Sequence, residues 1–167
     1  MDLFAIQLLG RSMHLAKESL ARCNEDLADD AWNVTLFFEF DDLPRHWRAI
    51  RTTYGLYVEV QNGRLHQFFS NGRGEHVEET FEDLIFIGAD SFAYIFRRAR
   101  SLYNSDSYPS HSNAGGNSWK DFTRGYGRED MEALDQEFYA QHPVKSLPDF
   151  VADFIKLHSQ DYVTQKA

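Results

Sequence analysis

Apolar residues recur every three or four positions along most of this chain, which is the spacing of amphipathic helices. The first two dozen residues show this spacing, so we expect a helix there, with Asn24 as a plausible stop. Its apolar face consists of Leu3, Ile6, Leu9, Met13, Ala16 and Leu20. Residues 34–40 are almost wholly apolar and fit either a short buried strand or a buried helical turn. Periodicity does not separate the two, and we favour the helical turn.

A long helix is predicted after Pro44, because a proline is tolerated in the first helical turn and an acid before it can cap the helix. Asp41 or Asp42 is the expected cap. Asn62 and Gly63 supply the left-handed stop that ends many helices. Residues 31–42 are therefore the part of the chain whose structure the pattern leaves open.

Four further helices follow from apolar periodicity and end signals. They are predicted over residues 76–87, 90–103, 129–139 and 147–158. Gly88 is expected to end the first of them, and Asp90 or Ser91 to cap the second. Residues 104–118 are rich in Ser, Asn, Gly and Pro, so we predict a long loop that is mobile or ordered by a partner.

These elements predict an all-α fold without a substantial sheet. We expect one domain over residues 1–167, built as a bundle or superhelical array of about seven to nine helices. The chain has 14 Phe and 8 Tyr, which supply bulky apolar surface for a core. The lone cysteine, Cys23, cannot form an intrachain disulfide, and no apolar run reaches membrane-spanning length. Both features indicate a cytoplasmic protein without a membrane anchor.

The histidines and the cysteine of this sequence do not form a recognisable catalytic or metal-binding motif. Seven histidines are present, but no two of them have the three- or four-residue spacing that places metal ligands on one helix face. Cys23 has no histidine close in sequence and is predicted near the end of a helix, where a thiolate is disfavoured. We therefore expect no metal, no cofactor, no catalytic residues and no enzymatic activity.

Charge is the strongest feature of the composition. The chain has 26 acidic and 17 basic side chains and a formal net charge of -9, which argues against direct binding to nucleic acid. Residues 25–42 contain seven acids, residues 75–90 six and residues 129–137 five. Acids three or four positions apart on a helix form rows with a spacing near that of backbone phosphates. Acids also stabilise the starts of helices, and this explanation stays open beside the first.

The candidate partner-binding surface therefore consists of the grouped acids. Its predicted members are Asp29, Asp30, Asp41, Asp42, Glu75, Glu78, Glu79, Glu82, Asp83, Glu129, Asp130 and Glu132. Whether they share one face depends on the fold. A partner of such a surface would present Lys and Arg side chains.

Three segments of the sequence resemble the DNA mimic protein 19-like family. Residues 59–71 are similar to that family's central signature, and residues 79–89 and 134–139 follow in the family's order, so that the similarity spans about residues 43–162. The chain departs from the family pattern at Arg64, where a second glycine is frequent, and at His66, where an acid is common. The signature residues are interpreted as structural: Asn62, Gly63, Gln67, Phe68, Phe69 and Asn71.

The resemblance implies a helical homodimer whose acidic surface competes with duplex DNA for a DNA-binding protein such as a transcription factor. A second class of function stays open. The chain is then a general protein-interaction module, such as an immunity or adaptor protein, which recognises its partner through aromatic residues and the loop at residues 104–118.

Overall fold

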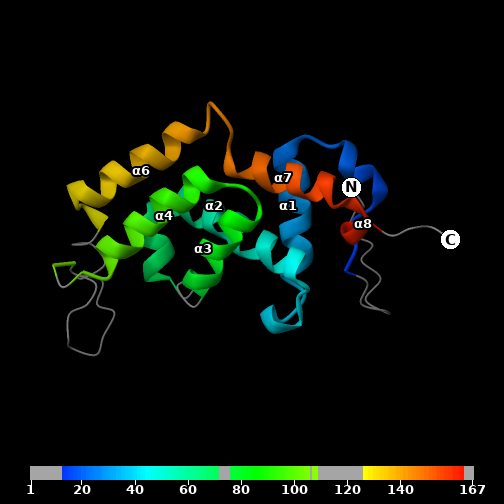
Figure 1. Ribbon diagram of the computed structural model, residues 1–167, viewed down its shortest axis with the longest axis horizontal. Coiled ribbons are helices and arrows are strands. Elements are labelled where there is room, and N and C mark those ends of the chain that lie inside the picture. Colours follow the sequence, from blue (N-terminus) through cyan, green and yellow to red (C-terminus); the bar gives the residue numbers. More distant parts are fainter. Residues whose placement is uncertain (1–12, 72–75, 106, 109–125, 164–167) are drawn as a thin grey trace.

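The computed structural model describes residues 13–71, 76–105, 107–108 and 126–163, and helices dominate these ranges (Figure 1). No strand occurs in them, and the only bridge of β type joins Leu15 to Val163. The all-α prediction is confirmed. In chain order the described helices are η1 (Lys17–Ala21), α1 (Asn24–Thr35), η2 (Phe40–Asp42), α2 (Arg45–Ser70), α3 (Val77–Phe86), α4 (Asp90–Tyr103), α6 (Glu129–Gln141), α7 (Leu147–Leu157) and α8 (Ser159–Tyr162), of which η1 and η2 are 3-10 helices.

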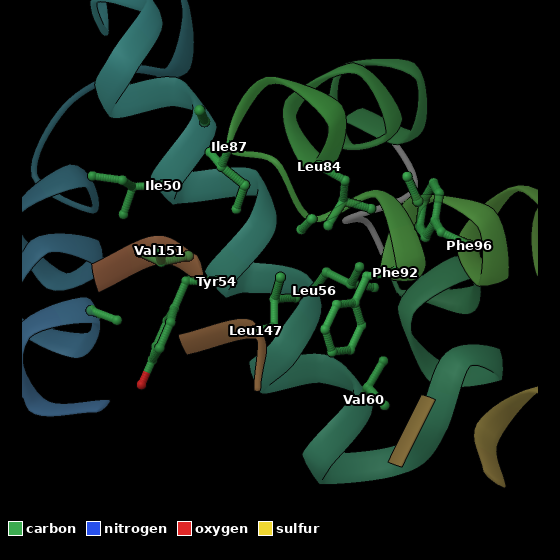
Figure 2. Packing of buried hydrophobic residues seen from close by; sticks show 14 of the residues in the cluster. Ile50, Tyr54, Leu56, Val60, Leu84, Ile87, Phe92, Phe96, Leu147 and Val151 are labelled. Carbon is green, nitrogen blue, oxygen red and sulfur yellow. The ribbon is translucent and has the colours of Figure 1, made fainter. Parts of the chain in front are cut away.

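The long helix α2 runs through the molecule and contacts α1, α3, α4, α6 and α7. Helix α1 packs on α7 toward the end of the molecule that holds α8, and α4 packs on α6 toward the other end (Figure 1). Figure 2 shows Tyr54 of α2 beside Val151 of α7, and Leu56 and Val60 of α2 beside Phe92 of α4. Consequently one helix contributes to the core along the whole length of the fold.

The predicted stop at Asn62 and Gly63 is a bend, after which the helix resumes and continues to Ser70. Gly63 has φ -166° and ψ 30°, and Arg64 has φ 67°, so the left-handed residue is Arg64 and not Gly63. Gly63 is still needed, because a Cβ there would lie 1.7 Å from the side-chain oxygen of Gln67. A second correction concerns the start of α2: Pro44 precedes its first residue, and neither Asp41 nor Asp42 caps it.

The prediction of a helix over the first two dozen residues is wrong for its described part. Residues 13–16 are not helical. They lie beside the end of α8, where the Leu15 backbone N–H donates to the Tyr162 carbonyl at 2.6 Å instead of to a carbonyl of its own segment. Only the short helix η1 follows. Asn24 begins α1 instead of ending a helix, and its side chain bridges Asp149 at 2.8 Å and Lys156 at 2.6 Å. Residues 1–12, which hold Leu3, Ile6 and Leu9, lie outside the described range.

Residues 34–40 form the end of α1 and the turn after it, so the helical reading was the closer one. The segment is not buried as expected, because Leu36 is 41% exposed and Phe37 is 57% exposed. Arg51 of α2 holds the turn in place by donating to the carbonyls of Thr35 at 2.9 Å and Phe38 at 2.6 Å. A tertiary contact with an arginine therefore replaces the apolar burial that the sequence indicated.

The four later helices are confirmed to within a few residues. Gly88 ends α3 with φ 79°, a conformation that favours glycine. The predicted cap of α4 is wrong, since Ala89 precedes the helix without a side-chain cap and Asp90 is its first residue. Ser146 and Asp149 form a capping box at the start of α7, which the sequence analysis did not predict.

Part of the predicted loop at residues 104–118 belongs to the core. The Tyr108 side chain is 2% exposed, and its hydroxyl lies 2.8 Å from Nδ1 of His66, which is itself 1% exposed. Residues 106 and 109–118 lie outside the described ranges. None of the described helices combines the length and apolar character needed to cross a bilayer.

Candidate partner-binding surface

A ring contact places the short helix η2 beside the start of α3. The rings of Phe40 and His76 are stacked, with centroids 3.7 Å apart and an interplanar angle of 15°. The hydrogen bond from Arg51 to the Phe38 carbonyl fixes the preceding turn on α2, so the chain folds back before it enters that helix. Two acid groups far apart in the sequence consequently become neighbours.

The exposed acids of these two helices form a surface that we call the η2–α3 patch. Its members are Glu39, Asp41, Asp42, Glu79 and Glu82, all of them exposed. Within the described part of the chain, no lysine or arginine forms an ion pair with any of the five. Glu79 and Glu82 are three positions apart on α3, a rise of about 4.5 Å. Glu39 was not predicted as a site residue, although it stands within the first acid group.

Glu78 also lies on the exposed side of α3, but its charge is compensated. Arg100 of α4 binds its carboxylate with two hydrogen bonds, one of them at 2.6 Å. A bidentate pair of this kind brings both charges together in a fixed geometry. Glu78 therefore contributes less negative field to the solvent than Glu79 or Glu82.

The prediction that Asp83 belongs to the acidic surface is wrong. Asp83 is 1% exposed and lies between α3 and α2. Its carboxylate forms an ion pair with Arg45 and accepts a hydrogen bond from the Thr52 hydroxyl at 2.6 Å. A buried carboxylate needs such partners to offset its loss of hydration. Asp83 is a structural link and not a contact residue.

The two predicted site residues of α1, Asp29 and Asp30, are partly buried and engaged by neighbouring side chains. Asp29 accepts hydrogen bonds from Asn33 at 2.9 Å and from the Tyr54 hydroxyl at 3.4 Å. Burial raises the pKa of Tyr54, and the Asp29 charge adds to that effect. Asp30 forms an ion pair with Arg22, which also reaches Asp26 at 3.3 Å. Arg22 is therefore the basic partner of both Asp26 and Asp30, whereas Asp29 has neutral hydrogen-bond partners and forms no ion pair within the described residues.

The acids at the start of α6 are compensated in the same way, with one exception. The hydrogen bond from Arg128 is the main cause that holds the pKa of Asp130 below its usual range. Glu132 lies 3.3 Å from the guanidinium of Arg64. Glu129 is exposed and has no ion pair in the described ranges.

The structure therefore does not gather the predicted acids on one face. In Figure 1 the start of α6 lies at the end of the molecule away from α1, and η2 follows directly below the end of α1. Glu75 lies outside the described residues. Of the predicted acids, the members of the patch that stand together without a basic partner are Asp41, Asp42, Glu79 and Glu82.

The signature residues have structural roles, as the sequence indicated. Phe68 and Phe69 lie in the core, at 2% and 8% exposure. The side chains of Gln67 and Asn71 both donate to the carboxylate of Glu59, at 3.1 and 2.9 Å. Glu59 thereby connects the helix before the bend to the helix after it.

The bend in α2 is completed by α6, the element that carries the last of the resembling segments. Asp135 accepts a hydrogen bond from the Leu65 backbone N–H at 2.9 Å, and the Tyr139 hydroxyl donates to the Val60 carbonyl at 2.8 Å. These bonds satisfy backbone groups that a bent helix leaves free. Burial raises the pKa of Asp135 to about 6. Two of the resembling segments therefore meet in space as one packed unit.

Comparison with known proteins gives one match. A family model described as DMP19-like protein matches residues 41–158, which is well over half of the chain. No curated protein and no solved structure is similar enough to count as a match. The matched region begins at η2 and ends after α7, so it includes most of the η2–α3 patch and the bend in α2.

Proposed function

Because the chain belongs to the DMP19-like protein family, we propose that it is a DNA mimic, which binds the basic DNA-binding face of another protein and blocks access to DNA. It acts by binding and not by catalysis. The observation that carries the proposal is the η2–α3 patch, where five exposed carboxylates form no ion pair in the described part of the chain, although Glu82 interacts electrostatically with Arg45. A transcription factor with Lys and Arg at its DNA-contacting surface is a suitable partner.

Electrostatics favours recognition through this patch over the other acid groups. An acid already paired with an arginine offers little net field, whereas unpaired acids attract a basic protein from a distance of about one Debye length, ~10 Å at 0.1 M salt. The partner's arginines would meet carboxylates in the places where they otherwise meet phosphates. Association should be fast and should weaken steeply as salt increases.

An apolar contact next to the patch adds affinity that charge alone does not provide. Leu36 and Phe37 are 41% and 57% exposed and stand a few residues before Asp41. A partner that covers the patch would also bury these two side chains. Buried apolar anchors with a charged rim are a common arrangement in protein interfaces.

The test combines capture with competition. The full chain is immobilised, exposed to a lysate of its own cell at low salt and eluted by a salt gradient. Proteins that elute are then purified and tested for binding to duplex DNA, with and without the chain. The proposal requires that an eluted protein binds DNA and that the chain displaces it from DNA. A variant that carries D41N, D42N, E79Q and E82Q should fail in both steps.

An eluted partner that does not bind DNA, or that binds the fourfold variant as well as the unchanged chain, contradicts the mimic proposal. That result favours a general interaction module, which recognises its partner through exposed aromatic residues. Phe37→Ser then becomes the informative variant. The resemblance also implies a homodimer, and sedimentation at several protein concentrations tests it.

A further inference from the structure

The structure brings together three side chains that have the ligand atoms for a metal ion. His46, His158 and Asp161 offer one ligand atom each, and these atoms all lie within 4.8 Å of one another. Nε2 of His46 is 3.7 Å from an Asp161 carboxylate oxygen, and the two imidazole rings have centroids 5.2 Å apart. Among the described residues, this is the one place where at least three His, Cys, Asp or Glu side chains bring their ligand atoms this close together. It shares no residue with the η2–α3 patch and is not used by the proposed function.

The backbone that carries these ligands is held firmly in place. His46 precedes Trp47 in α2, and Asp161 precedes Tyr162 in α8. The rings of Trp47 and Tyr162 pack edge to face at 4.9 Å, and both residues are buried. This contact fixes the distance between the two ligand-bearing segments. His158 stands at the junction of α7 and α8, and its carbonyl accepts the Asp161 backbone N–H at 2.9 Å.

The surroundings of the cluster also suit a metal ion. The His46 ring lies against Phe154 at 5.7 Å and Phe86 at 5.8 Å, so one side of the cluster is apolar. An apolar shell limits the access of solvent to a metal site and lowers the local dielectric. The other side is open, because the side chains of His46 and Asp161 are 32% and 41% exposed.

The nearby cationic side chains are engaged elsewhere. Arg45 precedes His46, but its guanidinium pairs with Asp83 and lies over the Phe86 ring at 4.3 Å. Lys156 of α7 donates to Asn24 at 2.6 Å. Neither positive charge is therefore directed to the space between the three ligands.

We propose that His46, His158 and Asp161 form a binding site for a divalent transition metal, with Zn²⁺ as the expected ion. Two imidazoles and one carboxylate are a common ligand set for zinc, whereas Mg²⁺ and Ca²⁺ prefer oxygen ligands alone. Ligand atoms around a tetrahedral Zn²⁺ are roughly 3.3 Å apart, as follows from bonds of about 2.0 Å. The 3.7 Å between His46 and Asp161 needs only a small side-chain adjustment.

The three ligands leave one tetrahedral position for water or for a group of a partner. The bound ion would tie α8 and the end of α7 to the start of α2, next to the bridge between Leu15 and Val163. Metal binding of this kind stabilises the folded chain, because the unfolded chain does not hold the three ligands together. The site should therefore be visible both in a binding titration and in the melting temperature.

The decisive experiment is calorimetric titration of the full chain, freed of metal by a chelator, with ZnCl₂ and separately with MgCl₂. We expect saturation at one Zn²⁺ per chain, with weak or no binding of Mg²⁺. Asp161→Asn and His158→Gln should each weaken zinc binding at least ~10-fold, since loss of even an outer-shell partner costs about that much. Zinc should raise the melting temperature of the unchanged chain and not that of the variants.

His76→Gln is the matched control. The cluster contacts α3 at its last residue, Phe86, whereas His76 precedes the first residue of that helix, about 15 Å away along ten residues. It should keep the zinc affinity of the unchanged chain. Circular dichroism verifies that each variant is folded, and Asp161→Asn changes an exposed residue, so it decides the matter if His158→Gln does not fold. Absence of saturable zinc binding, or equal affinity in Asp161→Asn, overturns the proposal.

Discussion

The η2–α3 patch and the start of α6 both contain grouped acids, but the two groups differ in how many of their acids are paired with arginines. Near α6 the arginines Arg64, Arg98 and Arg128 bind Glu132, Glu137 and Asp130, respectively. On the η2–α3 side, Glu78 is the one acid among the described residues that has an arginine partner at the surface. Groups of acids that look alike in the sequence therefore give unequal negative field in space.

This difference shows that arginine placement decides which acids are available to a partner. The arginines come from other elements of the fold, since Arg64 lies on α2, Arg98 on α4 and Arg128 just before α6. Exposed pairs of this kind contribute little to stability. Their main consequence is on the charge that the surface presents, and the following variants test that conclusion.

The largest effect is expected on stability and compares two adjacent acids of α3, Asp83 in the interior and Glu82 at the surface. Asp83→Ala removes the partner of Arg45 and Thr52 and should lower the free energy of unfolding by about 2–3 kcal/mol, because buried polar groups lose their hydrogen bonds. Glu82→Ala changes an exposed residue and should stay within about 0.5 kcal/mol. Urea unfolding of both variants measures the difference, and equal losses would contradict the assignment of Asp83 to the interior.

The next effect concerns binding and compares two sets of four substitutions. One set neutralises Asp41, Asp42, Glu79 and Glu82. The control set neutralises four acids that have an arginine partner, namely Glu78, Asp130, Glu132 and Glu137. Each set removes four negative charges from a net charge of -9 and leaves -5.

We expect the patch variant to associate with the captured partner at least about tenfold more slowly, since loss of electrostatic steering lowers on-rates by this order. The control set should have a smaller effect, although its net charge is the same. Surface plasmon resonance at two salt concentrations provides the rates. Equal slowing by both sets would mean that net charge, and not the patch, governs association.

A smaller effect, on stability, concerns the one buried acid of α6. Because burial raises the pKa of Asp135 to about 6, the folded state holds its proton more tightly than the unfolded state. The free energy of unfolding should therefore fall as pH rises from about 4 to about 6. Asp135→Asn keeps an oxygen for the Leu65 N–H but does not ionise. At pH 7 it should match or exceed the unchanged chain, by on the order of 1 kcal/mol.

Urea unfolding at pH 4 and at pH 7 tests this prediction, with Glu129→Gln as an exposed control on the same helix. The control should keep the pH dependence of the unchanged chain. If Asp135→Asn keeps it as well, Asp135 is already ionised in the folded state at low pH, and the interpretation of the buried carboxyl is wrong.

The smallest effect is expected from a substitution that adds an unpaired acid to the patch. Arg100→Gln releases Glu78, which stands beside Glu79 and Glu82 on the same helix. Association with the partner should become faster by a few-fold at low salt, and the gain should disappear at high salt. Arg98→Gln releases Glu137 on α6 and is the matched control. Faster association in the control alone would assign the contact to α6.

The helices of the second half were predictable because their apolar periodicity and their end signals agree. Residues 13–44 were not, because tertiary contacts determine their structure. Asn24 starts a helix where its side chain binds α7, and Arg51 replaces apolar burial around residues 34–40. Arg64 adopts the left-handed conformation that the sequence assigned to Gly63, since Asp135 and Tyr139 of α6 hold the bend.

The acid groups were visible in the sequence, but their pairing was not. Asp83 and Glu82 are neighbours in one run of acids, and only the packing of α3 on α2 separates their roles. The proposed metal site was not predicted, because the spacing between histidines does not reveal it. His158 and Asp161 have the three-residue spacing of paired ligands, and including carboxylates would have found this pair.

The course of α2 through the molecule has a consequence for unfolding. Both ends of the fold share this helix, so neither end retains a complete core once α2 loses its structure. A single cooperative transition is expected, and the slowest hydrogen exchange should occur at the amides of its middle turns.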